Sequence, residues 1–210
     1  MVHGKDQMTR LGVMGGTFDP LHWAHLVAAE TARVQFRLDR VLFIPAGEPP
    51  HKSDSPISDV EDRYAMTLLG TADNPHFEVS RMEIDRQGPS YSVDTIRALK
   101  GSYSPDVEVY FIMGADEALD LGNWHEAEAL PSLAHFLAAP RPGFHLSDLR
   151  TRLPECFQDA VELLPMSPVD LSSTKLRAKA TAGESIKYLV PENVESYIRK
   201  HGLYAKGIEK

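Results

Sequence analysis

Short apolar runs alternate with longer amphipathic ones along most of the chain. The apolar runs are rich in Val, Leu, Ile and Phe and several end at Gly or Pro, which is typical of strands. We predict strands over 10–16, 40–47, 76–84 and 107–114, and two further apolar runs cover 133–140 and 160–166. Apolar positions at helical spacing predict helices over 25–38, 58–72, 92–101, 115–122, 173–183 and 191–202.

Local signals mark where several of these helices begin and end. Ser58 followed by Glu61 has the spacing of a capping box at a helix start. Gly101 ends one predicted helix, while Pro191 and Gly202 stand near the first turn and at the end of the last one. Because helices of about 10 to 15 residues separate the strands, the sequence predicts an α/β protein. We expect a doubly wound, mostly parallel sheet covered by helices on both faces.

The chain of 210 residues is long enough for one substantial core. Met8 stands just before the first predicted strand, so we expect residues 1–7 to be an N-terminal extension and 8–210 to form a single domain. The last two predicted helices make a small C-terminal helical segment at about 172–204. The Pro-rich stretch 45–56 is predicted to be a loop after the second strand.

Composition limits the class of protein. Hydrophobic residues make up 42% and charged residues 25% of the chain, as in ordinary globular proteins. No apolar run approaches the roughly 18 to 20 residues of a membrane span, and the opening residues lack the apolar segment of a signal peptide. Cys156 is the only cysteine, which fits a reducing cytoplasm. The net charge of −8 argues against a nucleic-acid-binding surface, so we expect neither nucleic acid nor membrane as a partner.

A glycine pair, a turn and two histidines follow the first predicted strand, in the stretch GGTFDPLHWAH at 15–25. Glycines let backbone amides approach a ligand, and Asp19 with Pro20 predicts a helix N-cap and first turn. The amides and dipole of a helix N-terminus attract anions, and His22 and His25 are spaced to face one ligand there. Alone, the stretch leaves three interpretations open: a phosphate site, a plain turn with two surface histidines, or part of a zinc site.

A second helix start of this kind is predicted near the other end of the chain, in the stretch DLSSTKLR at 170–177. Hydroxyl residues open the helix, and Lys175 and Arg177 lie in its first turn. Basic residues at that end oppose the helix dipole, unless a bound anion satisfies both. Two such helix starts in one α/β chain suggest a polyphosphate held from both sides.

The two motifs together resemble those of the nucleotidyltransferase superfamily with the (H/T)-x-G-H signature. Within it, the chain is similar to the bacterial nicotinate-nucleotide adenylyltransferases over residues 10–204. Further segments of the similarity, in the family's order, are 45–52, 88–97, 112–130, 140–144 and 186–204. The resemblance implies a Rossmann-like α/β domain that transfers an adenylyl group from ATP to nicotinate mononucleotide. The products would be deamido-NAD and pyrophosphate, in NAD biosynthesis.

The resemblance also implies roles for the residues at the family's motif positions. The residues expected to act in catalysis, at the ATP phosphates, are His22, His25, Lys52 and Arg177. Those expected to bind the rest of ATP are Gly15, Gly16, Thr17, Phe18, Gly114, Asp116, Ser173 and Thr174. Those expected to bind nicotinate mononucleotide are Ser92, Trp124, His125 and Arg141. Trp124 would stack on the pyridine ring, with the Ser92 hydroxyl and the His125 amide at its carboxylate.

The chemistry of this reaction asks little of a general base. A phosphate monoester has a second pKa of about 6, so the attacking 5′-phosphate is already mostly a dianion at neutral pH. The enzyme must instead position the attacking phosphate in line with the α-phosphate of ATP and neutralise the charge of the phosphates. We therefore expect His22 and His25 to donate hydrogen bonds to phosphate oxygens. Mg²⁺ is expected to arrive with ATP, held mainly by its phosphates rather than by ligands from the chain.

Two positions depart from the family pattern and leave alternatives open. Ala24 replaces the usual glycine between the histidines, and its methyl group would weaken ATP binding if adenine packs against it. Ser92 replaces the usual Thr at the carboxylate position and keeps its hydroxyl, so we expect a preference for the acid over the amide substrate. The alternatives are an amide or dual-specificity adenylyltransferase, then a pantetheine-phosphate adenylyltransferase, then a non-catalytic nucleotide-binding regulator. A homo-oligomer also stays open.

Overall fold

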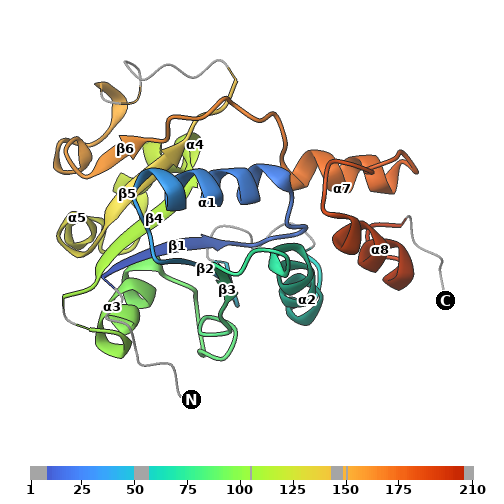
Figure 1. Ribbon diagram of the computed structural model, residues 1–210, viewed down its shortest axis with the longest axis horizontal. Coiled ribbons are helices and arrows are strands. Elements are labelled where there is room, and N and C mark those ends of the chain that lie inside the picture. Colours follow the sequence, from blue (N-terminus) through green and yellow to red (C-terminus); the bar gives the residue numbers. More distant parts are fainter. Residues whose placement is uncertain (1–8, 50–56, 105, 143–148, 150, 206–210) are drawn as a thin grey trace.

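The computed structural model describes residues 9–49, 57–104, 106–142, 149 and 151–205. Within this part, six parallel strands form one sheet in the order β3-β2-β1-β4-β5-β6 (Figure 1). The strands are β1 (Arg10–Gly16), β2 (Arg40–Pro45), β3 (Phe77–Val79), β4 (Glu108–Gly114), β5 (His135–Ala139) and β6 (Val161–Leu163). Strand β1 lies in the middle of the sheet, with β2 and then β3 on one side of it. The chain then crosses over, so that β4, β5 and β6 follow on the other side of β1. The predicted doubly wound α/β fold is confirmed.

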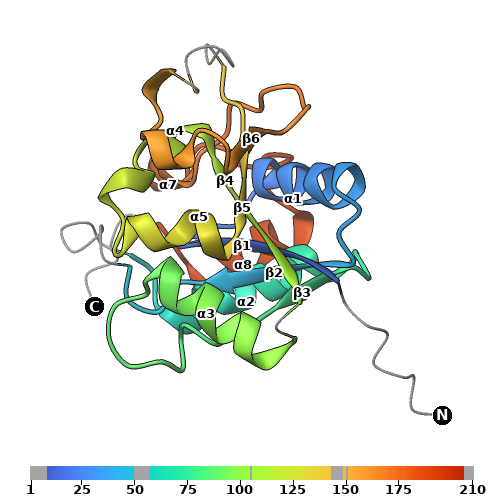
Figure 2. The same ribbon diagram turned by 90° about the vertical axis from the view of Figure 1, so that its left-hand side faces the viewer.

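Helices cover both faces of this sheet. Helix α1 (Trp23–Gln35) lies on one face, while α2 (Val60–Thr71) and α3 (Ser92–Ser102) lie on the other (Figures 1 and 2). The other helices and 3₁₀ turns are α4 (Ala115–Leu119), η1 (Leu121–Asn123), η2 (Ala127–Ala129), α5 (Leu130–Leu133), η3 (Glu155–Phe157), α7 (Ser173–Thr181) and α8 (Glu192–His201). Over the described ranges, none of the helices combines the length and the hydropathy needed to cross a membrane.

The strand side chains alternate between two apolar cores. In β2, Leu42 and Ile44 belong to the core that includes α3, whereas Val41 and Phe43 belong to the core that includes α1. All four side chains are buried. Each such side chain contributes roughly 1.5–3 kcal/mol when it leaves water. Because both faces of the sheet are covered, its strands read as nearly continuous apolar runs in the sequence.

The C-terminal helices pack on α2 through a third apolar cluster. Met66 of α2 meets Leu176 of α7 and Val194 and Ile198 of α8 there. Figure 1 shows these two helices at one end of the molecule, beyond α2. The small C-terminal helical segment is thus attached to the sheet domain by apolar contacts of its own. That 8–210 forms a single domain stays a prediction, and the predicted extension 1–7 lies outside the described residues.

Some predicted boundaries of helices and strands were wrong. Helix α2 is capped by Asp59 rather than Ser58, because the Asp59 carboxylate accepts a hydrogen bond from the Glu61 N–H at 2.8 Å. The strand predicted over 76–84 shortens to the three residues of β3, which lies at the edge of the sheet and pairs only with β2. Gly101 does not end α3 but lies inside it, one residue before the end.

Candidate active site

A cavity of about 480 Å³ opens at the carboxyl ends of the central strands. The ends of β1 and β4 contribute Gly15, Gly16 and Gly114 to its wall, at the point where the strand order reverses. Ligands of open α/β sheets bind at this switch point. The first residues or N-caps of four helices, α1, α3, α4 and α7, also line the cavity. The positive ends of these helix dipoles make it a place for anions.

The two histidines of the first motif stack at the start of α1. His22 is the N-cap residue and His25 is the third residue of the helix, and their ring centroids lie 3.7 Å apart at an interplanar angle of 16°. The His22 backbone N–H donates to His25 Nδ1 at 3.2 Å. An accepting Nδ1 leaves the proton of a neutral imidazole on Nε2, so His25 offers a donor at that nitrogen.

The helix therefore does not begin at Asp19 as the sequence suggested. Asp19 is 1% exposed, and its carboxylate accepts hydrogen bonds from the Tyr204 hydroxyl at 2.6 Å and the Ser58 N–H at 3.3 Å. Those partners lie far from it in the chain, whereas His22 has the extended backbone that an N-cap requires. The prediction of Asp19 as N-cap was wrong because tertiary contacts engage its carboxylate.

His22 is held in its neutral form. The side chain is 4% exposed, and burial, followed by the positive charge of Arg141, lowers its pKa to about 4. Its Nδ1 has no hydrogen-bond partner among the described residues. Buried polar atoms are almost always paired in folded proteins, so this nitrogen fits a place that a ligand atom completes.

The loop between β1 and α1 has a strained backbone. Phe18 has a φ of +50°, a left-handed value that side chains other than Gly, Asn and Asp rarely adopt, and it is 2% exposed. Its ring meets His25 edge-on with centroids 5.2 Å apart. A Cβ on Gly16 would stand 3.2 Å from the Phe18 ring, so the glycine makes room for this arrangement. Thr17, Phe18 and both strand-end glycines line the cavity.

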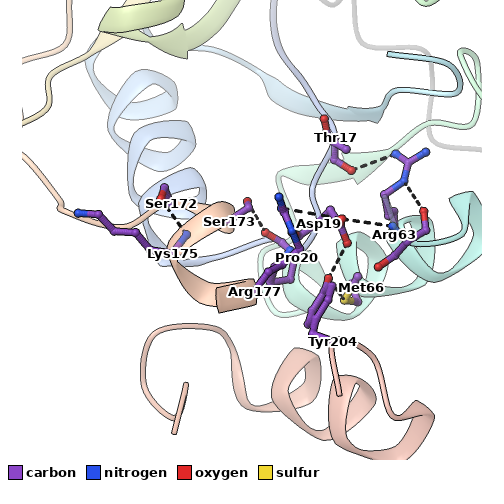
Figure 3. A network of polar contacts seen from close by, with 11 residues as sticks. Thr17, Asp19, Pro20, Arg63, Met66, Ser172, Ser173, Lys175, Arg177 and Tyr204 are labelled. Atoms are coloured by element: carbon purple, nitrogen blue, oxygen red, sulfur yellow. Dashed lines mark hydrogen bonds and ion pairs between the residues drawn. The ribbon is translucent and has the colours of Figure 1, made fainter. Parts of the chain in front are cut away.

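The second motif lines the same cavity at the start of α7, next to the β1–α1 loop. Ser172 caps this helix by accepting from the Lys175 N–H at 3.3 Å, and it lines the cavity with Ser173 and Thr174. The two predicted helix starts thus face one space. Arg177 does not line it, because its Nη1 donates to the Asp19 carbonyl oxygen at 2.8 Å behind the loop (Figure 3).

Two residues predicted to bind ATP, Gly114 and Asp116, lie at the start of α4, and Arg141 of the predicted mononucleotide set lies beside them. Gly114 is its N-cap, and the Gly114 N–H donates to Glu117 Oε2 at 3.1 Å. Asp116 forms an ion pair with Arg141 at 2.9 Å, and both side chains are about half exposed. Arg141 and Gly114 line the cavity, whereas Asp116 lies just outside its wall.

An aromatic wall closes the side where the mononucleotide is expected. Trp124 meets Phe111 edge-on with centroids 5.9 Å apart, and His125 stacks on Tyr91 at 4.2 Å. Ser92 is the first residue of α3 and lines the cavity beside these rings. Tyr91 was missed by the sequence reasoning, although an aromatic residue directly before a predicted helix start was a signal for it.

Two other buried polar residues near the cavity were also missed. Glu83 lines it and accepts from the Thr95 hydroxyl at 2.5 Å, and burial raises the pKa of its carboxyl group. Arg63 is 2% exposed and donates to the carbonyl oxygens of Thr17 at 3.0 Å and Ala46 at 2.7 Å. A charged residue on the apolar face of a predicted helix was the available signal for Arg63.

Two further points from the sequence concern Lys52 and a zinc site. Lys52 lies outside the described residues, so its place beside the phosphates stays a prediction. Across the part of the chain that the structure describes, no three His, Cys, Asp or Glu side chains gather closely enough to hold a metal ion. The zinc interpretation of His22 and His25 therefore has no set of ligands among those residues.

Comparison with known proteins places the chain in a family. The family model of cytidylyltransferase-like proteins matches residues 13–179. The chain belongs to the cytidylyltransferase-like family. Family membership agrees with the resemblance drawn from the two motifs, since both lie within the matched residues.

Curated relatives match nearly the whole chain. A protein of Moorella thermoacetica is 50% identical over 198 residues, covering 93% of this chain and 91% of the relative. A protein of Salinispora arenicola is 47% identical over 193 residues, covering 92% of this chain and all of the relative. Both carry the name "probable nicotinate-nucleotide adenylyltransferase".

Solved structures share the fold of this family. Plasmodium falciparum nicotinic acid mononucleotide adenylyltransferase complexed with NaAD is similar with a TM-score of 0.77 and 19% identity, over 93% of this chain and 97% of that one. The same enzyme complexed with APC gives a TM-score of 0.75 at 18% identity. At such identities the likeness concerns the fold.

Proposed function

We propose that the protein transfers the adenylyl group of ATP to nicotinate mononucleotide and releases deamido-NAD and pyrophosphate. The observation that carries the proposal is the convergence of the α1 and α7 N-termini on one cavity that also contains His22 and His25. Relatives at 50% and 44% identity over most of the chain carry the corresponding name.

The reaction is a direct displacement at phosphorus. An oxygen of the mononucleotide 5′-phosphate attacks the α-phosphorus of ATP and forms the new P–O bond. The bond from the α-phosphorus to the bridging oxygen breaks, and pyrophosphate leaves with its electron pair. Because the nucleophile is already a dianion at neutral pH, the protein orients the two phosphates in line and neutralises their charge.

The α1 side of the cavity receives the ATP phosphates. His25 Nε2–H and the backbone amides of the glycine-rich loop donate hydrogen bonds to phosphate oxygens. His22 is neutral in the free protein, and a phosphate beside its buried ring would favour the imidazolium form and raise its pKa. Mg²⁺ enters with ATP as part of the substrate, bound to phosphate oxygens and water.

The α7 side completes the triphosphate site. The Thr174 hydroxyl and the backbone amides of Ser173 and Thr174 offer donors at the first turn of the helix, where the dipole also favours an anion. The Ser173 hydroxyl itself donates to the Pro20 carbonyl oxygen. Arg177 supports this side through the Asp19 carbonyl oxygen and adds positive charge behind the loop. Lys52 would be a further ligand of the phosphates.

The mononucleotide occupies the aromatic side. Trp124 stacks on the pyridine ring, and the start of α3 with the Ser92 hydroxyl and His125 receives the ring carboxylate, a group suited to a helix N-terminus. Because charged nucleotides do not cross a lipid bilayer unaided, the proposed enzyme works in the cytoplasm beside its substrates.

Pyrophosphate release tests the proposal. The protein is mixed with Mg²⁺ and ATP, and with nicotinate mononucleotide, nicotinamide mononucleotide or phosphopantetheine as the acceptor. We expect release with the nicotinate substrate, in large excess over the amide. Greater pyrophosphate release with nicotinamide mononucleotide would make the amide the preferred substrate. Release with phosphopantetheine alone would refute the proposed function. ATP binding without release in any mixture would identify a nucleotide-binding regulator.

A further inference from the structure

The loop that connects β1 to α1 is held from behind by side chains of other elements. Its carbonyl oxygens accept from Arg63 at Thr17, from Arg177 at Asp19 and from Ser173 at Pro20; these bonds are 3.0, 2.8 and 3.0 Å long (Figure 3). The donors come from α2 and α7. Tertiary contacts from two helices thus fix the carbonyl oxygens of this loop.

Tyr204 supplies the contact that reaches the loop from the end of the chain. Its hydroxyl donates to Asp19 Oδ1 at 2.6 Å across 185 positions of sequence (Figure 3). Burial, followed by the bond to Asp19, raises the pKa of the Tyr204 phenol, so it stays a donor at neutral pH. A charge-assisted hydrogen bond of this kind is among the stronger polar contacts in proteins.

The backbone at Gly202 and Tyr204 has the left-handed conformation, and this places the Tyr204 hydroxyl beside Asp19. Gly202 ends α8 with a φ of +64°, and Tyr204 itself has a φ of +63°. A left-handed conformation is unfavourable for tyrosine and persists only where surrounding contacts enforce it. One such contact is the Thr181 hydroxyl, which donates to the Tyr204 carbonyl oxygen at 2.9 Å.

We propose that Tyr204 is a positioning residue for the adenylyl transfer: it fixes Asp19, and through Asp19 the loop that carries Phe18 and His22. The inference rests on the proposed function, which assigns the cavity beside this loop to ATP. Asp19 lies between Phe18 and His22, so a shift of its carboxylate moves the phosphate-binding backbone and the start of α1 together. The mononucleotide side of the cavity is built from other elements and does not share this support.

The chain offers a matched control for Tyr204. The Tyr197 hydroxyl also donates to a carboxylate, Asp62 Oδ1, at 2.8 Å, and this bond joins the C-terminal segment to α2. Asp62 is not part of the β1–α1 loop. Tyr204→Phe and Tyr197→Phe therefore each remove one phenolic hydroxyl bonded to a carboxylate, and only the first touches the loop.

Steady-state kinetics and thermal unfolding of the two variants test the proposal. We expect Tyr204→Phe to lower kcat/KM for ATP by about tenfold or more, since a misplacement of reacting groups by about 1 Å can cost about 100-fold in rate. Its KM for the mononucleotide should equal that of Tyr197→Phe, which should keep wild-type kinetics. A purely structural role would lower the melting temperature of both variants and leave both KM values unchanged.

The outcomes separate this inference from the proposed function. If wild-type protein releases no pyrophosphate, the proposed function fails and the role of Tyr204 in the transfer fails with it. If the wild type is active and the two variants have equal kinetics, only the positioning role is overturned. Should Tyr204→Phe be unfolded at the assay temperature, Thr181→Val removes the hydrogen bond to the Tyr204 carbonyl oxygen and so tests the placement of Tyr204; an unchanged kcat/KM for ATP there overturns the proposal.

Discussion

Burial of His22 makes the free energy of unfolding depend on pH. Its pKa in the folded protein is about 4, lowered from 6.5 by burial and then by the charge of Arg141. In the unfolded chain the imidazole takes up a proton near pH 6.5. The unfolded state therefore binds more protons between these two values, so stability rises with pH across the window and is lost as the pH falls from 6.5 to 4.

The size of the effect follows from the two pKa values. A shift from 6.5 to about 4, at about 1.4 kcal/mol per pKa unit, removes about 3 kcal/mol of stability once the pH is below both values. About 2 kcal/mol of this loss should already be present near pH 5. Since total stabilities are about 5–15 kcal/mol, the loss is large enough to measure.

Urea unfolding of wild-type protein and His22→Gln at a series of pH values checks this reasoning. The variant lacks the titrating ring, so wild type should lose about 2 kcal/mol more than the variant between about pH 7 and pH 5. Carboxylates that titrate in the same range are common to both proteins and cancel in the comparison. His76→Gln is the control, because it replaces an exposed histidine. Parallel curves for wild type and His22→Gln would refute the argument.

Three further substitutions test the site and its packing. His25→Ala should lower kcat about 100-fold or more with little change in melting temperature; near-normal pyrophosphate release would contradict its role at the phosphates. Ala24→Gly should lower the KM for ATP, because Ala24 lines the cavity and the change removes a methyl group; an unchanged or higher KM would argue against contact with adenine. Gly47→Ala would put a Cβ 2.3 Å from the Glu83 carbonyl oxygen and should cost about 1–3 kcal/mol in urea unfolding, whereas Gly101→Ala, with open space around its Cβ, should not destabilise.

The sheet could be predicted because its signal is local. The strands β1 and β4 are buried on both faces, so each appears in the sequence as an apolar run that ends in glycine. The C-terminal end of α8 was equally clear, since Gly202 takes the left-handed conformation that its position in the sequence suggested. Such features depend on neighbours within a few residues.

The supports of the site could not be predicted because their partners lie far away in the chain. Nothing near Asp19 in the sequence indicates that Tyr204 and Ser58 will engage its carboxylate, and so the N-cap passes to His22. The Arg63 guanidinium likewise donates to carbonyl oxygens of two separate loops, at Thr17 and at Ala46. A motif thus locates the cavity, while the contacts that hold the motif in place require the fold.

The acidic balance of the chain does not conflict with a site for polyanions. The net charge is −8, yet exposed charges are screened beyond about 8 Å at physiological ionic strength, so distant carboxylates contribute little inside the cavity. What a phosphate meets there is local: four helix N-termini, the Arg141 guanidinium and His25 as a donor. One acid of the lining, Glu117, is partly compensated because it accepts from the Gly114 N–H at 3.1 Å. Binding of a polyanion therefore depends on where these helices begin rather than on the total charge of the protein.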